Sequence, residues 1–206
     1  GTVAGVCVSD SSGEVPEGME LLVGDHPIPG PASFRAGRRA LEAARACEGR
    51  CIVLLSGGGS ALCEQPLPGV PEEFVSDVTR ALLAGGASIG ETNLVRGHLS
   101  AIKAGGLARA AGGTVETMVL MDVSGLGPGI VASGPTWSEG EGSVEEAISL
   151  LEHHGIRVPA DVEQAIRSAD RSSVRGPVAV IADGRDAAMA LASAARSEGL
   201  RSDVAA

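Results

Sequence analysis

The chain has 206 residues and a hydrophobic fraction of 44%, which is enough for a sizeable core in one or two domains. Its formal net charge of −10 argues against nucleic acid and anionic membranes as partners, because both attract basic surfaces. No apolar run approaches the roughly 20 residues of a membrane-spanning helix, and the start lacks a signal-peptide pattern. The four cysteines show no CxxC spacing, so we expect free thiols in a reducing cytoplasm.

The first half of the chain alternates predicted strands and helices. Short apolar runs predict strands over 3–8 and 20–23. Pro31 fits the first turn of a helix that continues to about residue 47. A buried strand over 51–55 follows, which we expect at the centre of a Rossmann-like, mostly parallel sheet with helices on both faces. A helix is predicted over 71–84, because acidic residues lie in its first turn and glycines follow its end.

The strand over 51–55 ends abruptly in a run of small residues: Ser56, Gly57, Gly58, Gly59 and Ser60. Consecutive glycines can adopt positive φ and turn several N–H groups towards one point, which forms an anion-binding nest. The run also follows the carboxyl end of a strand, where α/β folds bind ligands. A tight strand-to-helix connection is the simpler interpretation of a lone glycine run, so the residues themselves leave both functions open.

A helical pattern runs from 87 to about 111, with weak points at Gly97 and at Gly105. If this helix is continuous, four polar residues fall on one face: Asn93, Arg96, Ser100 and Lys103. Solvation is the ordinary explanation for such a face, but it carries donors and no acids in a strongly acidic chain. Lys103 is also the only lysine. A compact ammonium suits the binding of a moving phosphoryl group, so we interpret this face as an anion site.

Another predicted strand, over 117–121, places Asp122 at its end. A carboxylate in that position is placed to contact a metal or a substrate hydroxyl, or simply to cap a turn. A second cluster of small and hydroxyl-bearing residues follows the glycines after this strand: Ser133, Gly134, Pro135 and Thr136. By itself this cluster indicates only a turn.

The rest of the chain predicts helices over 143–155 and 161–168, then a polar linker over 170–176. A strand over 177–181, a helix over 185–196 and the start of a strand over 202–206 follow. We therefore expect a first α/β domain over 1–169 and the first part of a second α/β domain over 177–206. Because this last unit is unfinished, we expect exposed apolar surface over 177–206.

Five blocks in this order resemble one family, the bacterial and archaeal glycerate 2-kinases: LLSGGGSAL, AGGASIGETN, VRGHLSAIKAGGLA, MDVSG and IVASGPT, with HPIP before the first helix. The resemblance covers nearly the whole chain. It implies a kinase that transfers the ATP γ-phosphoryl group to a hydroxyl of D-glycerate with Mg²⁺, giving 2-phosphoglycerate. It also implies two α/β domains with the active site between them, and a homo-oligomer or partner chain could supply segments absent here.

Carried over by position, the resemblance implies that the loop over 56–60 binds phosphate and that Lys103, Arg96 and Asp122 are catalytic. Asp122 would also hold Mg²⁺. Glycerate or a similar hydroxy acid would bind at a further set of residues: Asn93, Ser100, Ser133, Gly134 and Thr136. We expect replacement of Lys103 by Met to weaken phosphate or nucleotide binding roughly tenfold, with little change in thermal stability.

The chain departs from the family pattern at five positions that usually carry charge: Gly30, Gly97, Gly106, Leu126 and Gly127. Two acids are lost beside the expected metal site, at Leu126 and Gly127. A second class of function therefore remains open, namely a non-catalytic α/β module that binds a small anion such as a sugar acid or phosphate.

Overall fold

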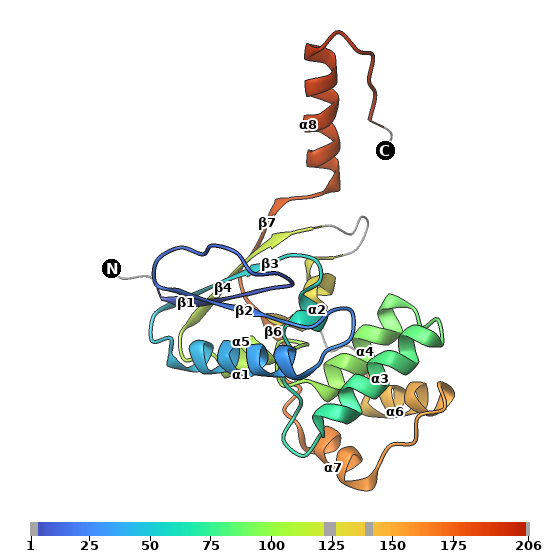
Figure 1. Ribbon diagram of the computed structural model, residues 1–206. Helices are drawn as coiled ribbons and strands as arrows, with labels where there is room; N and C mark the ends of the chain where they lie inside the picture. Colours follow the sequence, from blue (N-terminus) through green and yellow to red (C-terminus); the bar gives the residue numbers. More distant parts are fainter. Residues whose placement is uncertain (1–3, 122–126, 139–141, 205–206) are drawn as a thin grey trace.

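A computed structural model describes residues 4–121, 127–138 and 142–204. Strands and helices are interspersed along the chain, with the four helices α2 to α5 in succession between β3 and β4 (Figure 1). In chain order, the elements are β1 (Gly5–Ser9), β2 (Met19–Val23), α1 (Pro31–Ala46), β3 (Arg50–Leu55), α2 (Gly59–Leu62), α3 (Glu72–Ala84), α4 (Ile89–Leu99), α5 (Gly106–Ala110), β4 (Thr114–Leu120), the 3-10 segment η1 (Pro128–Ser133), β5 (Trp137–Ser138), α6 (Val144–His153), α7 (Ala160–Ser168), β6 (Val174–Arg175), β7 (Val178–Ala182) and α8 (Gly184–Ser197).

The strands form a parallel three-stranded sheet in the order β3-β4-β7, a parallel pair β1-β2 and a short antiparallel pair β5-β6. Parallel strands connected through helices confirm the predicted α/β class. The expectation that 51–55 forms the central strand is wrong, because among the described strands β3 pairs only with β4 and lies at the edge of this sheet. The apolar run of β3 is the more hydrophobic one, but central position depends on pairing between distant segments, and β4 accepts both neighbours.

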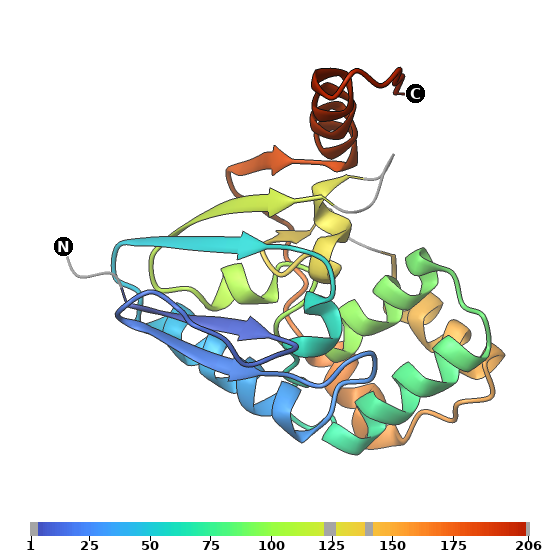
Figure 2. The same ribbon diagram turned by 45° about the horizontal axis from the view of Figure 1, so that its top comes forward.

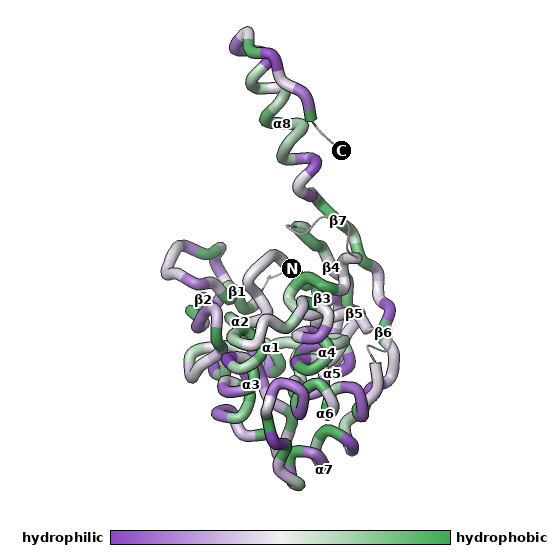
Figure 3. The backbone as a smooth tube through the Cα atoms, turned by 90° about the vertical axis from the view of Figure 1, so that its right-hand side faces the viewer, coloured by the Kyte–Doolittle hydropathy of each residue, from purple (hydrophilic) through white to green (hydrophobic). Residues whose placement is uncertain are grey.

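One face of this sheet is covered and the other is open. In Figure 2, α1 and α5 lie below the strands. The large apolar side chains on the opposite face of β3 and β4 are exposed. The exposed fractions there are 51% for Ile52, 71% for Leu54 and 46% for Leu120. Figure 3 shows this apolar stretch of backbone continuing from β3 and β4 into β7.

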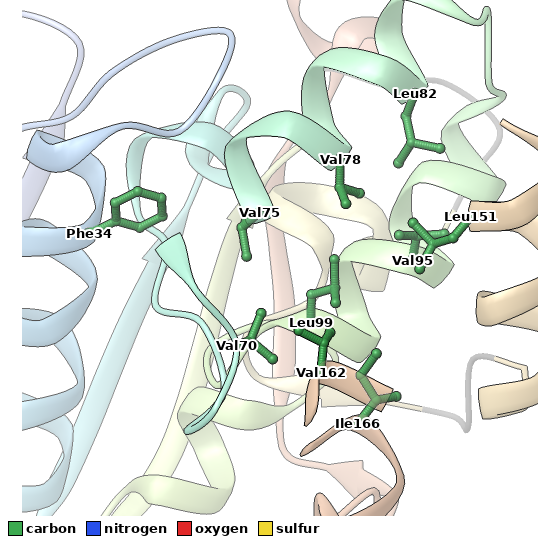
Figure 4. Packing of buried hydrophobic residues seen from close by; sticks show 10 residues of the cluster. All are labelled: Phe34, Val70, Val75, Val78, Leu82, Val95, Leu99, Leu151, Val162 and Ile166. Carbon is green, nitrogen blue, oxygen red and sulfur yellow. The ribbon is translucent and has the colours of Figure 1, made fainter. Parts of the chain in front are cut away.

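The main hydrophobic cluster lies beside the sheet, between helices (Figure 4). Its members come from α1, the chain before α3, and α3, α4, α6 and α7: Phe34, Val70, Val75, Val78, Leu82, Val95, Leu99, Leu151, Val162 and Ile166. Val95 and Leu99 lie four residues apart and turn one face of α4 into this cluster. Complete burial of such a side chain contributes about 1.5–3 kcal/mol, so α4 is firmly held along this face.

The helical pattern over 87–111 does not form one continuous helix, because α4 ends at Leu99 and α5 begins only at Gly106. Ser100 has extended backbone angles (φ −104°, ψ 141°), and its hydroxyl accepts hydrogen bonds from the N–H groups of Ile102 and Lys103. Such local bonds from a serine compete with the helical pattern. The chain between the two helices therefore forms a tight turn, in which Ala104 and Gly105 both have positive φ.

The C-terminal region combines β7, which pairs in parallel with β4, and α8, which projects away from the body in Figure 1. The strand expected to open a second domain thus extends the sheet of β3 and β4, and the domain division after residue 169 stays a prediction. The expected exposed apolar surface is confirmed, with Ile181 at 61%, Leu191 at 73% and Leu200 at 63%. The strand expected over 202–206 is absent from its described part, residues 202–204, which form no regular element.

No helix in the described part of the chain is long and apolar enough to cross a membrane. The four cysteines carry free thiols.

Candidate anion-binding site

The glycine loop lies at the carboxyl end of β3, as predicted. Residues Ser56, Gly57 and Gly58 are exposed, and Gly58 is left-handed with φ 81°. Only a residue without Cβ adopts this conformation at little cost. The N–H groups of Gly57 and Gly58 donate no hydrogen bond to any residue of the described ranges, so they are available to a ligand.

The loop leads into the short helix α2, which packs closely on η1. A Cβ atom on Gly59 would lie 2.9 Å from the Cβ of Ala132, so a side chain at that position would push the two segments apart. Three consecutive residues at the end of η1 have left-handed φ: 53° for Ala132, 59° for Ser133 and 62° for Gly134. Such conformations are unfavourable for residues with a side chain and persist where the surrounding structure holds them.

A chain of hydrogen bonds joins three segments that are far apart in the sequence. The hydroxyl oxygens of Ser60 and Ser133 lie 2.7 Å apart, and Ser133 also donates to the Oδ1 of Asn93 at 2.7 Å. Ser60 comes from α2, Ser133 from the end of η1 and Asn93 from α4. The glycine loop, the second small-residue cluster and the polar helix face therefore meet at one place.

Backbone bonds fix the turn after α4 to the same place. The N–H of Ala104 donates to the carbonyl of Ser133 at 3.0 Å, and the N–H of Gly105 donates to the carbonyl of Gly134 at 2.7 Å. Farther along, the Thr117 hydroxyl on β4 donates to the Thr136 hydroxyl at 2.8 Å, and both side chains are buried.

Lys103 is buried in an ion pair with Glu64, and each side chain is only 1% exposed. The ammonium bonds to Oε2 of the Glu64 carboxylate, while Oε1 accepts the hydroxyl of Ser100 at 2.5 Å. Helix α1 packs directly against the backbone of Glu64. A Cβ on Gly37 of this helix would collide with the Glu64 carbonyl oxygen, so only glycine permits this close approach. Ser100 and Lys103 thus converge on a carboxylate instead of lining an open helix face.

Arg96 lies one turn after Asn93 on α4 and is 8% exposed. Its guanidinium makes no hydrogen bond or ion pair with any residue in 4–121, 127–138 or 142–204, whereas its backbone carbonyl accepts the N–H of Ser100. Burial lowers the pKa of its guanidinium, and the negative charge of Glu64 partly offsets this effect. A buried guanidinium in this condition is well suited to receive an anion.

The structure therefore brings most of the predicted site residues together, in two adjoining groups. Asn93, Ser133 and Ser60 form the hydroxyl and amide group, and Ser100 and Lys103 form the buried group around Glu64. Asp122 lies outside the described residues, so its role as a metal ligand stays a prediction. Within the described residues, no group of three or more His, Cys, Asp or Glu side chains could hold a metal ion.

Glu64 is a site residue that none of the sequence motifs indicates. Its isolation is nevertheless visible in the sequence, since it is the only charged residue between Cys51 and Pro71. A lone carboxylate in an apolar and glycine-rich stretch needs a cationic partner if it is buried, and a lone lysine has the same requirement.

Two of the departures from the family pattern have local structural explanations. Gly30 is the N-cap residue of α1, where the carboxylate of Asp25 accepts the N–H groups of Ala32 at 2.9 Å and Ser33 at 3.3 Å. Asp25 thus supplies the acidic group at the helix start. A Cβ on Gly106 would collide with the backbone of Ala101, so the turn before α5 excludes any side chain there.

Comparisons with known proteins agree with the motifs. Residues 2–167 match the family described as "Domain of unknown function (DUF4147)". The chain is 42% identical over 151 residues to the D-glycerate 2-kinase of Thermotoga maritima, which covers 72% of this chain and 36% of that protein. It is 34% identical over 206 residues to a protein of Agrobacterium vitis named "Putative hydroxypyruvate reductase", which covers 96% of this chain and 47% of the relative.

The fold also matches a solved structure. The crystal structure of glycerate kinase from Thermotoga maritima superposes with a TM-score of 0.82 at 34% identity, over 95% of this chain and 49% of that one. The chain thus spans about half or less of the length of each of these relatives. The resemblance to glycerate kinases seen in the sequence motifs is confirmed, and the chain belongs to the DUF4147 family.

Proposed function

We propose that this chain takes part in ATP-dependent phosphorylation of D-glycerate, in which the γ-phosphoryl group moves to a hydroxyl and gives 2-phosphoglycerate. The relatives named D-glycerate 2-kinase and glycerate kinase support the reaction type. The observation that carries the proposal is the hydrogen-bonded chain Ser60–Ser133–Asn93, because it joins three motif blocks beside an exposed glycine loop.

The residues of this chain would act mainly by binding and orienting anions. Phosphoryl transfer requires positioning and positive charge around the phosphoryl oxygens more than covalent chemistry by the protein. The N–H groups of Gly57 and Gly58 would bind phosphate oxygens, and Arg96 would add positive charge. The hydroxyl of Ser133 and the amide of Asn93 would orient the hydroxy acid. ATP would supply the transferred group.

Mg²⁺ fits this arrangement in a limited way. The described residues offer no cage of carboxylates, so a metal ion would depend on Asp122 and on the phosphates of the nucleotide. Mg²⁺ commonly takes one or two protein carboxylates, substrate phosphates and several waters, so one acidic residue is enough. The ion would neutralise charge on the phosphate oxygens.

The alternative is a module that binds a small anion without turnover. Leu126 and Gly127 stand where the resembling family has acids, and this favours the alternative. The names of the relatives point to a small carboxylate as the ligand. Glycerate and hydroxypyruvate are both three-carbon carboxylates, and they differ only at C2, which carries a hydroxyl in one and a carbonyl in the other.

The test is an assay of the protein with ATP, Mg²⁺ and D-glycerate, in which ADP release and phosphoglycerate are measured together. We expect Ser133→Ala to lower kcat/KM at least tenfold, because it breaks the hydrogen-bonded chain at its centre. The matched control is Ser168→Ala, whose hydroxyl bonds only within its own helix. Glycerate binding without ADP release would favour the alternative. If the protein instead oxidises a reduced nicotinamide cofactor in the presence of hydroxypyruvate and phosphorylates no glycerate, the proposed kinase function is wrong.

A further inference from the structure

The buried charges beside the site do not balance. Among Asp, Glu, Lys and Arg side chains of the described residues, only Glu64, Arg96 and Lys103 are buried to more than nine-tenths. Two of them are cations and one is an anion. An uncompensated buried charge is costly unless a counter-charge reaches it, so this region is prepared for an anion.

The two cations are not equivalent. Both oxygens of the Glu64 carboxylate are occupied, one by the ammonium of Lys103 and the other by the hydroxyl of Ser100. The Glu64 carboxylate therefore neutralises the charge of the Lys103 ammonium, and both carboxylate oxygens already have a hydrogen-bond donor. Arg96 feels Glu64 only through space and keeps its guanidinium donors free of every described residue.

Arg96 is also the cation that lies next to the hydroxyl and amide group formed by Asn93, Ser133 and Ser60. Positions three apart on a helix lie on the same face, so Arg96 follows Asn93 on the side of α4 that contacts η1. Asn93 accepts the hydroxyl of Ser133 on that side. A carboxylate or phosphate bound there could receive two parallel N–H bonds from the planar guanidinium.

We infer that Glu64 is a positioning residue that takes Lys103 out of direct contact with the ligand and leaves Arg96 as the cation that binds its anionic group. The inference rests on the proposed function and reverses the assignment made from the sequence, in which Lys103 contacts the phosphoryl group. The shared ligand chemistry is an oxyanion, which the carboxylate of glycerate and a phosphoryl group both provide.

The experiment measures binding of inorganic phosphate and of D-glycerate by calorimetry, together with the thermal midpoint, for the unchanged protein and four variants. Arg96→Met removes the charge and Arg96→Lys keeps it on a different head. Lys103→Met breaks the buried pair, and Glu64→Gln with Lys103→Met replaces both charges by neutral groups. The two probes distinguish which oxyanion Arg96 binds.

Arg96→Met is expected to weaken binding of at least one probe tenfold or more without lowering the thermal midpoint, because it removes a buried charge that no described residue pairs through a hydrogen bond or ion pair. A residue with a merely structural role would not show this combination. Arg96→Lys is expected to recover part of the affinity. Lys103→Met is expected to lower the midpoint by 5 °C or more, because it leaves the Glu64 carboxylate buried without its cation.

The double variant decides the inference. We expect it to recover most of the midpoint lost in Lys103→Met and to bind both probes within about threefold of the unchanged protein. Recovered stability with a tenfold loss of affinity would show that Lys103 contacts the anion, which overturns the inference and leaves the proposed function intact. Unchanged affinity in Arg96→Met would also overturn it. Failure of the unchanged protein to bind either probe would overturn the proposed function and the inference together.

Discussion

The thiol of Cys63 lies next to the buried ion pair and shows how strongly this region is desolvated. Burial raises the pKa of Cys63 to about 11, and the nearby charges of Lys103 and Glu64 act in opposite directions on it. The proton is therefore held more tightly in the folded than in the unfolded chain. The stabilisation from the neutral thiol is present below the ordinary thiol pKa and is lost as the pH rises towards 11.

Cys63 should accordingly resist alkylation. The thiolate is the reactive form, so at pH 7.5 iodoacetamide is expected to modify Cys63 in the folded protein roughly a hundredfold more slowly than in urea. Peptide mass spectrometry measures the rate for each cysteine in one experiment. Equal rates in the folded and unfolded protein would contradict the burial of this thiol.

Lys103 shows why burial matters for interpreting a substitution. The sequence leads to the expectation that Lys103→Met changes thermal stability little. The structure changes this expectation, because the variant leaves the Glu64 carboxylate buried without its cation. Removal of one partner of a buried pair typically costs about 3–5 kcal/mol, whereas replacement of both partners is often neutral.

Helix α4 is the element on which the candidate site depends, since it carries both Asn93 and Arg96. Its start is a capping box, in which Ser88 accepts the N–H of Glu91 at 3.2 Å and the Glu91 carboxylate accepts the N–H of Ser88 at 2.7 Å. The latter bond lowers the pKa of Glu91. Its contribution to stability is therefore present above the ordinary glutamate pKa and lost as the pH falls through the lowered one.

Removal of this cap should affect both stability and the site. Ser88→Ala is expected to lower the free energy of unfolding by about 1 kcal/mol, the usual cost of an N-cap serine. The matched control is Ser143→Ala, which removes the corresponding cap of α6. Urea denaturation should show similar losses for both variants, while calorimetry should show weaker anion binding only for Ser88→Ala. Equal effects of the two variants on anion binding would show that the site does not depend on α4.

On the scale of the whole molecule, the open face of the β3-β4-β7 sheet and the projecting α8 leave several large apolar side chains accessible. Large exposed apolar side chains on neighbouring strands often mark a contact surface. It contrasts with the helical cluster on the other side of the molecule, where Leu82 is 0% exposed.

Substitutions on the two surfaces should therefore behave differently. Leu54→Ser, at a side chain that is 71% exposed, is expected to change the free energy of unfolding by no more than about 0.5 kcal/mol and to reduce binding of an apolar fluorescent dye. Leu82→Ala should cost about 2–5 kcal/mol, because it empties a fully packed position. A large loss of stability in Leu54→Ser would show that its side chain is covered.

The sequence by itself determined the features that depend on neighbouring residues. The helix start at Pro31, the helix cap at Ser143, the glycine run after β3 and the α/β class all follow from caps, periodicity and backbone restrictions that act within a few residues. The family motifs added chemistry to these elements, and the hydrogen bonds among Ser60, Ser133 and Asn93 agree with them.

Tertiary structure decided the features that depend on distant pairing. Glu64 meets Lys103 across 39 positions of the chain and Ser100 across 36, and no local pattern encodes such a contact. The same holds for the edge position of β3, which reflects what β4 pairs with. The end of α4 at Ser100 belongs here too, because the hydroxyl that ends the helix also bonds to Glu64. Long-range packing thus determined which cation is neutralised and which is left for a ligand.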